Sequence, residues 1–307
     1  MNLLIAPIQG FTDAAWRSAH ARAMARHGLS LTYFAPFIRV EKGSVRPRDM
    51  RDIDSANNPG VNIVPQVIFK DITELQIATD AIIALGYQHI NLNMGCPFPP
   101  QLKAGRGTAV IKNLPLMLEV AKFIDKHADL SFSIKMRPGL IDFDLWREIM
   151  PTLNSMRLEM VIVHPRRAAD RYNGEISIDS FRSISRDCTH PVVYNGDITT
   201  PLNYAQTIRQ LPDIQNIMIG RGVLARPSLP LEIVTGKEWT ADDRRAMWVE
   251  IFKNLADTIV SNTMGGSHQA LDRLKPRLEY VEANIFDRRY LKSLKKASTL
   301  ERFLTLL

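Results

Sequence analysis

The sequence contains two cysteines, and one of them, Cys96, stands where it could do chemistry. It lies in "NMGCPFPP" (93–100), between a glycine and a proline and directly behind the apolar run "HINL". A lone cysteine is most often a small buried hydrophobic side chain. A thiol at the end of a strand can instead act as an acid, because its ordinary pKa of about 8.5 keeps it mostly protonated at neutral pH. The surroundings of Cys96 decide between these two interpretations.

Other reactive or ligand-binding side chains also stand at the ends of apolar runs. A single lysine, a single histidine or an Asn-Gly-Asp turn usually has an ordinary structural explanation. Several of them at corresponding positions predict one common site. These positions are Gln66, Asn93, Lys135, His164, Asn195, Gly196, Asp197, Gly220 and Arg221.

Eight short apolar or β-rich runs carry these residues, and most predict strands buried on both faces, as in a parallel sheet. The runs occupy residues 3–8, 31–37, 62–69, 89–94, 131–136, 160–165, 191–196 and 216–221. Helical patterns between them occupy residues 12–28, 72–86, 113–128 and 143–156. Pro151 predicts a kink or a split in the last of these helices. This alternation of strands and helices is typical of an α/β fold, a (β/α)8 TIM barrel.

A doubly wound open sheet is the competing fold. No G-x-G-x-x-G follows the first strand and no G-x-x-x-x-G-K-[ST] occurs anywhere, so neither of its phosphate-binding motifs is present. In a barrel, the carboxyl ends of the strands carry the chemistry, and phosphates bind at the turns after the seventh and eighth strands. We therefore expect backbone N–H groups near Gly196 and Gly220, with Arg221, to hold a phosphate dianion.

The pattern changes near residue 238, after which only helical patterns occur. We predict a catalytic barrel over residues 1–238 and a small helical domain over residues 239–307. The second segment is rich in basic residues, which predicts either a nucleic-acid surface or a merely solvated helix face. These residues are Arg273, Lys275, Arg277, Arg288, Arg289, Lys292, Lys295 and Lys296.

Composition places the chain among ordinary globular proteins, with 45% apolar and 23% charged residues. No apolar run approaches the roughly 18 residues of a membrane helix, and the start resembles no secretory signal. Cys188, just before the seventh strand, is predicted to be structural. Two cysteines 92 residues apart predict neither a disulfide scaffold nor a metal site, so we expect a cytoplasmic protein. The net charge of +7 favours polyanionic partners only weakly.

Taken together, the motifs resemble those of the tRNA-dihydrouridine synthases. The similar stretches, in the family's order, are "LLIAPIQGFTDAAWR", "NLNMGCP", "SIKMR", "IVHPR", "VVYNGDI", "IMIGRGVLARP" and, in the tail, "HQALDRLKPRLEYV". The resemblance implies a flavin-bearing barrel that reduces particular uridines in tRNA with electrons from NADPH. The tail and length are most similar to the bacterial branch that acts on the D-loop at position 16. The chain differs from the family at Ile8, where methionine is usual, and in the Phe98–Gln101 loop.

The resemblance also implies roles for individual residues. Cys96 becomes the general acid that protonates uracil C5, and Lys135 and Gln66 bind the polar edge of flavin mononucleotide (FMN). The remaining residues expected to bind the cofactor are Ala6, Pro7, Ile8, His164, Asn195, Gly196, Asp197, Gly220 and Arg221. Those expected to bind the substrate are Asn93, Arg166, Arg171, Arg273, Lys275 and Arg277.

Two other classes of function remain open from the sequence. One is a flavin-dependent barrel oxidoreductase on a free small substrate, similar to dihydroorotate dehydrogenases. The other is a tRNA-binding protein without catalytic activity. We expect a monomer with no metal and no membrane partner, whereas the uridine position and the preference for NADPH over NADH are not determined by these motifs.

Overall fold

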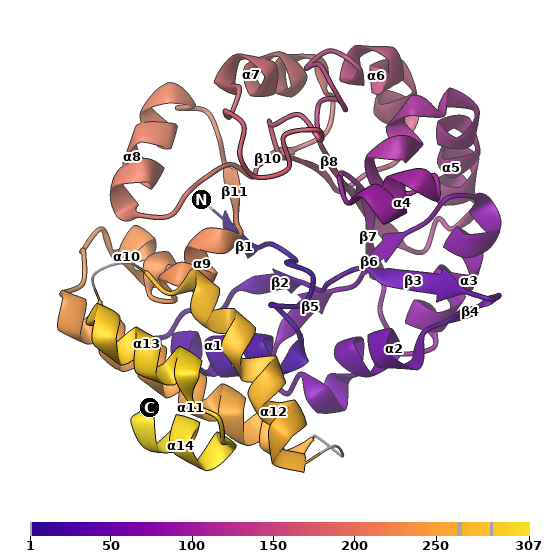
Figure 1. Cartoon of the computed structure of the whole chain (residues 1–307). Coiled ribbons are helices and arrows are strands. Elements are labelled where there is room, and N and C mark those ends of the chain that lie inside the picture. Colours follow the sequence, from indigo (N-terminus) through magenta and orange to yellow (C-terminus); the bar gives the residue numbers. More distant parts are fainter. Residues whose placement is uncertain (1, 263–265, 283–284) are drawn as a thin grey trace.

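The computed structural model describes residues 2–262, 266–282 and 285–307. Its centre is a parallel sheet that curls into a barrel, with helices around the outside (Figure 1). The parallel strands are β1 (Asn2–Ile5), β2 (Thr32–Phe34), β3 (Ile38–Glu41), β5 (Asn62–Val64), β6 (Gln66–Ile68), β7 (His89–Met94), β8 (Ser131–Met136), β9 (Met160–Val163), β10 (Val192–Tyr194) and β11 (Asn216–Ile219). A short β4 (Ser44–Val45) pairs antiparallel with β3.

Prolines break two of the predicted strands into halves. Pro65 separates β5 from β6, and Pro36 lies between β2 and β3. Proline has no N–H to donate, so each ladder is interrupted there. The sheet order runs β4-β3-β6-β7-β8-β9-β10-β11-β1-β2-β5, and its last strand continues along the chain into β6. Because β2 pairs with β5 and β3 pairs with β6, the sheet closes, and the predicted (β/α)8 barrel is confirmed.

Several helices around the barrel begin at a side-chain cap, which satisfies unpaired N–H groups of the first turn. Asp13, Asp71, Asn113, Ser177 and Thr200 each accept a hydrogen bond from the first turn of the helix that follows. The helices are α1 (Ala14–Arg26), α2 (Pro47–Ile53), η1 (Ser55–Asn57), α3 (Ile72–Ile83), α4 (Pro99–Lys103), η2 (Gly107–Lys112), α5 (Leu114–Lys126), α6 (Trp146–Ser155), α7 (Ile178–Asp187), α8 (Pro201–Gln210), α9 (Arg221–Ala225) and α10 (Leu229–Thr235). Helix α6 continues through Pro151 rather than splitting there.

The C-terminal segment is helical, as predicted, and lies beside α1 (Figure 1). It contains α11 (Ala241–Ser261), α12 (Gly266–Leu274), η3 (Lys275–Tyr280), α13 (Arg288–Lys296) and α14 (Leu300–Leu306). Trp248 on α11 is 1% exposed and its ring stacks on that of Phe252. The sequence boundary at 238/239 falls between α10 and α11. That residues 239–307 form a separate domain stays a prediction.

One part of the barrel interior is apolar, and a continuous apolar layer lies outside the barrel. Leu4, Phe34, Ile162, Val193 and Met218 form this part of the interior, each from a different strand. Among the described residues, no helix is both long enough and apolar enough to cross a membrane.

Candidate active site

Two adjoining cavities open at the carboxyl ends of the strands. The cysteine cavity is lined by residues including Gln66, Asn93, Cys96 and Arg137. The glycine cavity is lined by Ala6, Pro7 and Ile8 together with 195–199 and 220–222. The two cavities share Pro7, Lys135, His164 and Tyr172. Side chains from most of the predicted strand ends therefore meet at one mouth, as the barrel topology requires.

The loop that carries Cys96 is held by Asn93 and by a close glycine contact. The Oδ1 atom of Asn93 accepts hydrogen bonds from the N–H groups of Cys96 (2.9 Å) and Gly95 (3.2 Å). On the other side, Gly107 lies so close that a Cβ there would stand 2.6 Å from the carbonyl oxygen of Cys96. The N–H of Thr108 also donates to that carbonyl, at 3.2 Å. The thiol is thus presented on a fixed backbone.

A chain of uncharged hydrogen bonds supports Asn93 from inside the barrel. Its Nδ2 donates to Gln66 Oε1, and Gln66 Nε2 donates to Asn91 Oδ1, each at 2.7 Å. Asn91 in turn donates to the hydroxyl of Ser133 at 2.8 Å. Gln66, Asn91 and Ser133 are fully buried, where a polar group without a partner would be costly. Gln66 and Asn93 therefore have structural partners as well as a place on the cavity wall.

The surroundings of Cys96 keep its thiol protonated. Burial raises the pKa of Cys96, and this outweighs the opposite effects of the Phe98 N–H, Arg137 and Lys135. A thiol with a raised pKa is a proton donor at neutral pH rather than a nucleophile. Cys188 is also buried, but it lies at the C-terminal cap of α7.

Lys135 brings an amino group to the site. It stands beside Asn93 in the β7–β8 register and lines both cavities. It makes no hydrogen bond or ion pair with any other residue in the described part of the chain. Burial, followed by the nearby charge of Arg137, lowers its pKa to about 7. A ligand with negative charge or acceptor atoms would meet an unpaired ammonium group here.

The glycine cavity carries a charged network centred on Asp197. Its carboxylate forms a close ion pair with Arg166 and a second one with Arg221 (2.6 Å). Burial alone would raise the pKa of Asp197, but the two arginines lower it. Asp197 therefore fixes the guanidinium groups, and Arg221, whose side chain is 30% exposed, still faces the mouth.

His164 is uncharged in these surroundings. It is 8% exposed, and burial together with the charges of Arg137 and Lys135 lowers its pKa well below the usual value. Arg166 lies against the same ring, with Nη1 3.3 Å from Nε2 of the histidine. A neutral imidazole can offer a hydrogen bond to a ligand without adding to the positive charge.

Asn195, Gly196 and Gly220 shape the floor of the glycine cavity. Asn195 Nδ2 donates to the carbonyl of Met218 at 2.8 Å, which links β10 to β11. A Cβ at Gly196 would stand 2.0 Å from the hydroxyl of Tyr194, so packing alone demands glycine there. A Cβ at Gly220 would meet Ile8 Cδ1 at 3.4 Å. A methyl group added at Gly220 would therefore make ordinary contact with the wall formed by Ile8.

Sequence reasoning assigned no role to two residues that line the mouth, Arg137 and Tyr172. Arg137 is 2% exposed and donates to the carbonyl of Arg167 at 2.9 Å. The guanidinium groups of Arg137 and Arg221 lie 5.8 Å and 4.7 Å from the centre of the Tyr172 ring. Arg137 could have been found, because it is two residues beyond Lys135 and shares its side of the strand. Tyr172 lies in a loop and has no periodic signal.

The basic residues predicted to bind substrate lie in different environments. Arg166 is buried at Asp197, whereas Arg171 is exposed and has a φ of 51°. In the tail, Lys275 is partly exposed. Arg273 and Arg277 both contact the carboxylate of Asp13, and the Arg277 side chain is only 6% exposed.

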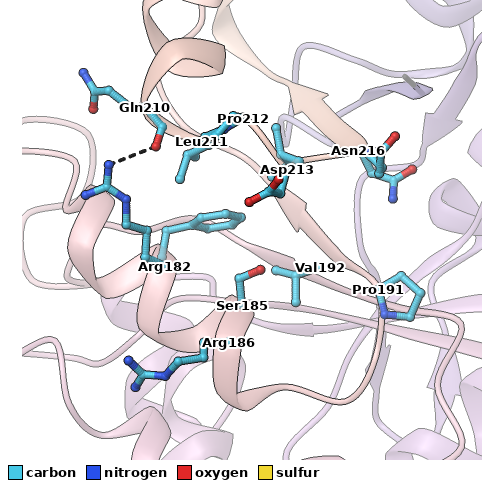
Figure 2. Close-up of a pocket in the computed structure, with 13 residues that line it drawn as sticks. Arg182, Ser185, Arg186, Pro191, Val192, Gln210, Leu211, Pro212, Asp213 and Asn216 are labelled. Carbon is cyan, nitrogen blue, oxygen red and sulfur yellow. Dashed lines mark hydrogen bonds between the residues drawn. The ribbon is translucent and has the colours of Figure 1, made fainter.

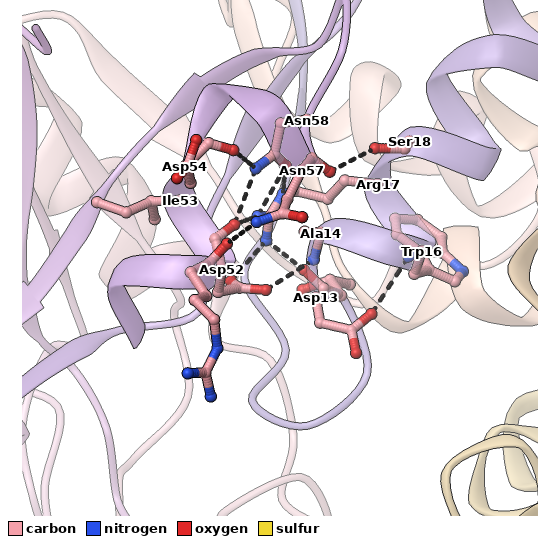
Figure 3. Close-up of polar contacts among 12 residues, drawn as sticks. Asp13, Ala14, Trp16, Arg17, Ser18, Asp52, Ile53, Asp54, Asn57 and Asn58 are labelled. Atoms are coloured by element: carbon pink, nitrogen blue, oxygen red, sulfur yellow. Dashed lines mark hydrogen bonds and ion pairs between the residues drawn. The ribbon is translucent and has the colours of Figure 1, made fainter. Parts of the chain in front are cut away.

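A buried arginine fixes the start of α1 next to this mouth (Figure 3). Arg17 donates to the Thr12 carbonyl (2.7 Å) and to the side chains of Asp52 (3.1 Å) and Asn58 (2.9 Å). Asp52 also accepts from the N–H of Ala14 at 2.7 Å. These contacts tie the β1–α1 loop to α2 and η1, and so hold the wall formed by Pro7 and Ile8.

A larger cavity of ≈ 500 Å³ lies at the opposite end of the barrel (Figure 2). Val192 and Asn216, the first residues of β10 and β11, line it together with α7. Its arginines, Arg182 and Arg186, are ion-paired with Asp179 and Asp187. It is therefore separate from the mouth that contains Cys96 and Lys135.

Comparison with known proteins identifies the family of this chain. A family model described as "Dihydrouridine synthase (Dus)" matches residues 4–305. tRNA-dihydrouridine synthase B of Yersinia pestis is 27% identical over 240 residues, which cover 75% of this chain and 70% of that protein. The protein of the same name from Escherichia coli (strain K12) is 28% identical over 234 residues, which cover 76% and 71%.

Solved structures support the fold. A variant of NCR from Zymomonas mobilis has a TM-score of 0.53 at 13% identity, covering 84% of this chain and 93% of that one. Morphinone reductase in complex with tetrahydroNAD has a TM-score of 0.50 at 11% identity, covering 78% and 88%. At such identities the likeness concerns the fold alone. Because the family model spans nearly the whole sequence, this chain belongs to the dihydrouridine synthase family.

Proposed function

We propose that this protein reduces specific uridines in tRNA to 5,6-dihydrouridine, with FMN as cofactor and NADPH as electron donor. One observation carries the proposal. Lys135, whose amino group has no ion-pair partner among the described residues, and Cys96, whose thiol has a raised pKa, line the same cavity at the barrel mouth. Reduction of a carbon–carbon double bond needs positive charge to stabilise a reduced cofactor and an acid to protonate carbon. Membership in the family supplies the kind of reaction.

The residues at the mouth suit FMN. Arg221 lines the glycine cavity, and its ion pair with Asp197 holds the guanidinium group in place. A guanidinium held in this way could bind a phosphate dianion. Lys135 would meet the polar edge of the ring system, and Ala6, Pro7 and Ile8 would form an apolar wall beside it. Asn195 and Gly196 would contribute backbone groups at the phosphate end. A ligand that spans both cavities must pass Tyr172 and His164, which line both.

FMN held in this site would supply the hydride for C6 of uracil, with NADPH as the source of its electrons. Cys96 donates the proton to C5, and its raised pKa keeps that proton in place until the base arrives. Asn93 and Gln66 hold the cysteine loop, so the thiol points into the cavity at a fixed position. Lys135 stabilises negative charge beside the same cavity. The thiolate left after transfer regains its proton from solvent.

A uridine inside a folded tRNA must be turned out of its stack to reach such a mouth. We propose that Arg171 at the mouth and Arg273 and Lys275 in the tail contact the RNA, since each retains exposure. Arg166 and Arg277 are buried in ion pairs, so we assign them positioning roles. Action at D-loop position 16 remains a prediction from the resemblance.

Reconstitution tests the proposal directly. Purified protein is incubated with FMN, NADPH and an unmodified tRNA transcript, and the nucleosides are analysed by mass spectrometry. We expect dihydrouridine at a defined position in the tRNA, and no reduction of free uracil or orotate. Reduction of the free bases, with tRNA left unchanged, would instead favour a small-molecule oxidoreductase. Flavin-free protein without any reductase activity would contradict both.

A further inference from the structure

The tail contacts the barrel beside the glycine cavity, at the β1–α1 loop (residues 6–13). The Nη2 atom of Arg277 lies 2.7 Å from Oδ2 of Asp13, and that of Arg273 lies 3.3 Å from the same oxygen. The ring of Tyr280 packs edge-on against Phe11, with 4.7 Å between centroids. Two separate contacts thus join η3 and the end of α12 to one loop.

That loop is the one that forms the wall of the cavity. Thr12 is 1% exposed, and its hydroxyl accepts from the N–H of Ile8 at 2.8 Å. The N–H groups of Phe11 and Thr12 donate back to the Ile8 carbonyl, at 3.0 and 3.1 Å. Ile8 lines the cavity and faces Gly220. Displacement of Phe11 or Asp13 would therefore move Ile8.

The same part of the tail also supports the opposite side of that cavity. Helix α9 begins at Arg221, directly after Gly220, and η3 packs against it. The N–H of Glu282 donates to the carbonyl of Ala225, the last residue of α9, at 3.2 Å. The segment 273–282 thus bridges the two sides of the cavity, the β1–α1 loop and α9.

Asp13 serves the barrel and the tail through different oxygens. Its Oδ1 atom accepts from the N–H of Trp16 and caps α1, while Oδ2 accepts from the two tail arginines. Arg277 also donates to the Arg273 carbonyl, so it joins the end of α12 to the loop. The Arg277 side chain is 6% exposed and that of Asp13 is 24% exposed, so loss of either partner would leave a largely buried charge unpaired.

We infer that Arg277 and Tyr280 are positioning residues for the cofactor cavity, so that docking of the tail and binding of FMN are coupled. This inference rests on the proposed function, because it concerns the same cofactor site. The coupling is reciprocal: the docked tail tightens FMN binding, and bound FMN stabilises the docked tail. RNA bound to the tail would then change FMN binding in the site where its uridine is reduced.

The test uses Asp13→Asn and Arg277→Gln in the full-length protein, with FMN affinity measured by fluorescence quenching. Asparagine caps a helix as well as aspartate does, so Asp13→Asn removes the ion pair while keeping the start of α1. We expect FMN affinity to fall at least about fivefold in each variant, the lower end of typical coupling between sites. The double variant should lose less than the product of the two effects, because both remove one contact.

Matched controls come from the exposed ion pair between Arg245 and Asp242 on α11, with a distance of 2.6 Å. Asp242→Asn and Arg245→Gln make the same changes of charge in the tail away from the cavity. They should bind FMN as the wild type does. The inference would be overturned if FMN affinity fell equally in the Asp13/Arg277 variants and in the control variants. It would also be overturned if folded Asp13→Asn and Arg277→Gln bound FMN as tightly as the wild type.

Hydrogen exchange in the wild type tests the coupling without any variant. FMN should slow amide exchange in η3 (Lys275–Tyr280), and unchanged exchange there at saturating FMN would overturn the inference. The outcomes are distinguishable from failure of the proposed function. Wild-type protein that binds no FMN contradicts the proposed function, whereas active protein with uncoupled variants contradicts only the coupling.

Discussion

The two cavities at the barrel mouth are built from different interactions. Around Cys96, neutral amides and a close glycine hold the loop, and burial leaves the thiol with a raised pKa. Around Asp197, arginines and a carboxylate form an ion-paired network that leaves positive charge facing the opening. Neutral surroundings suit an acid that must keep its proton, and charged surroundings suit an anion that must be held. The comparison predicts that changes on the two sides affect different measurements.

The largest effect is expected on the cysteine side. Cys96→Ala should lower the rate of dihydrouridine formation by about 10²- to 10⁴-fold, the usual contribution of a positioned acid. FMN affinity should stay near that of the wild type, because the thiol holds no part of the glycine cavity. Quantifying dihydrouridine in tRNA over time, beside a flavin titration, checks both. Cys188→Ala is the control, since that thiol lies at the end of α7, and it should keep normal activity.

On the charged side, Arg221→Ala should weaken FMN binding by roughly 10- to 150-fold, because a hydrogen bond to a charged group contributes about 1.5–3 kcal/mol. With saturating FMN, turnover should recover most of its wild-type value. A flavin titration followed by an activity assay measures both. Arg209→Ala, at an exposed arginine on α8, should change neither quantity. Unchanged FMN affinity in Arg221→Ala would show that Arg221 does not bind the phosphate of FMN.

A methyl group at Gly107 should displace the cysteine loop. Its Cβ would lie 2.6 Å from the Cys96 carbonyl oxygen and 2.9 Å from Cys96 Cβ. We expect dihydrouridine formation to fall about tenfold in Gly107→Ala with FMN affinity retained, since small misplacements of a reacting group are costly. Gly105→Ala is a close control. Its φ of 78° is also left-handed, but its Cβ would come no nearer than 3.7 Å to another residue.

Gly105→Ala should be less stable than the wild type, as we also expect for Gly107→Ala, because both glycines have a left-handed φ. Its rate of dihydrouridine formation should stay at the wild-type value. Equal rates in the two variants would mean that the close contact does not position the thiol.

FMN binding should also depend on pH. Lys135 has its pKa lowered to about 7 in the free protein, so its ammonium is present below pH 7 and is lost as the pH rises. A ligand that favours the charged form raises that pKa on binding. FMN affinity should then fall above pH 7, by up to about tenfold per pH unit. The phosphate of FMN ionises near pH 6, so its own titration does not account for a change in FMN affinity between pH 7 and pH 9.

Lys135→Met should bind FMN weakly and with a flatter profile across that window. If FMN affinity in Lys135→Met fell with pH as steeply as in the wild type, a group other than Lys135 would cause the pH dependence.

The sequence allowed most of the fold to be predicted, because strands and amphipathic helices have local periodic patterns. Strands β7 and β8 occupy the predicted residues. The breaks at Pro36 and Pro65 and the β3–β4 hairpin were missed, since each strand half is too short for a clear period. Proline within a run was the available signal.

The polar residues of the site were predictable where they end a strand, as Lys135 and His164 do. Their partners were not. The ion pair between Asp13 and Arg277 joins residues that are 264 positions apart, and no local pattern reports such a contact. For the same reason, Arg277 was predicted to bind substrate, although its guanidinium is buried against the barrel. Tyr172 lies in a loop, where only the folded structure reveals its place between the cavities.

We propose that Cys96 donates a proton to the uracil and contributes neither to FMN binding nor to its reduction. Stopped-flow absorbance of the flavin in Cys96→Ala separates the two half-reactions. We expect NADPH to reduce the flavin at close to the wild-type rate, whereas tRNA should reoxidise it about 10²- to 10⁴-fold more slowly. Slow reduction by NADPH, or reoxidation by tRNA at the wild-type rate, would contradict this proposal.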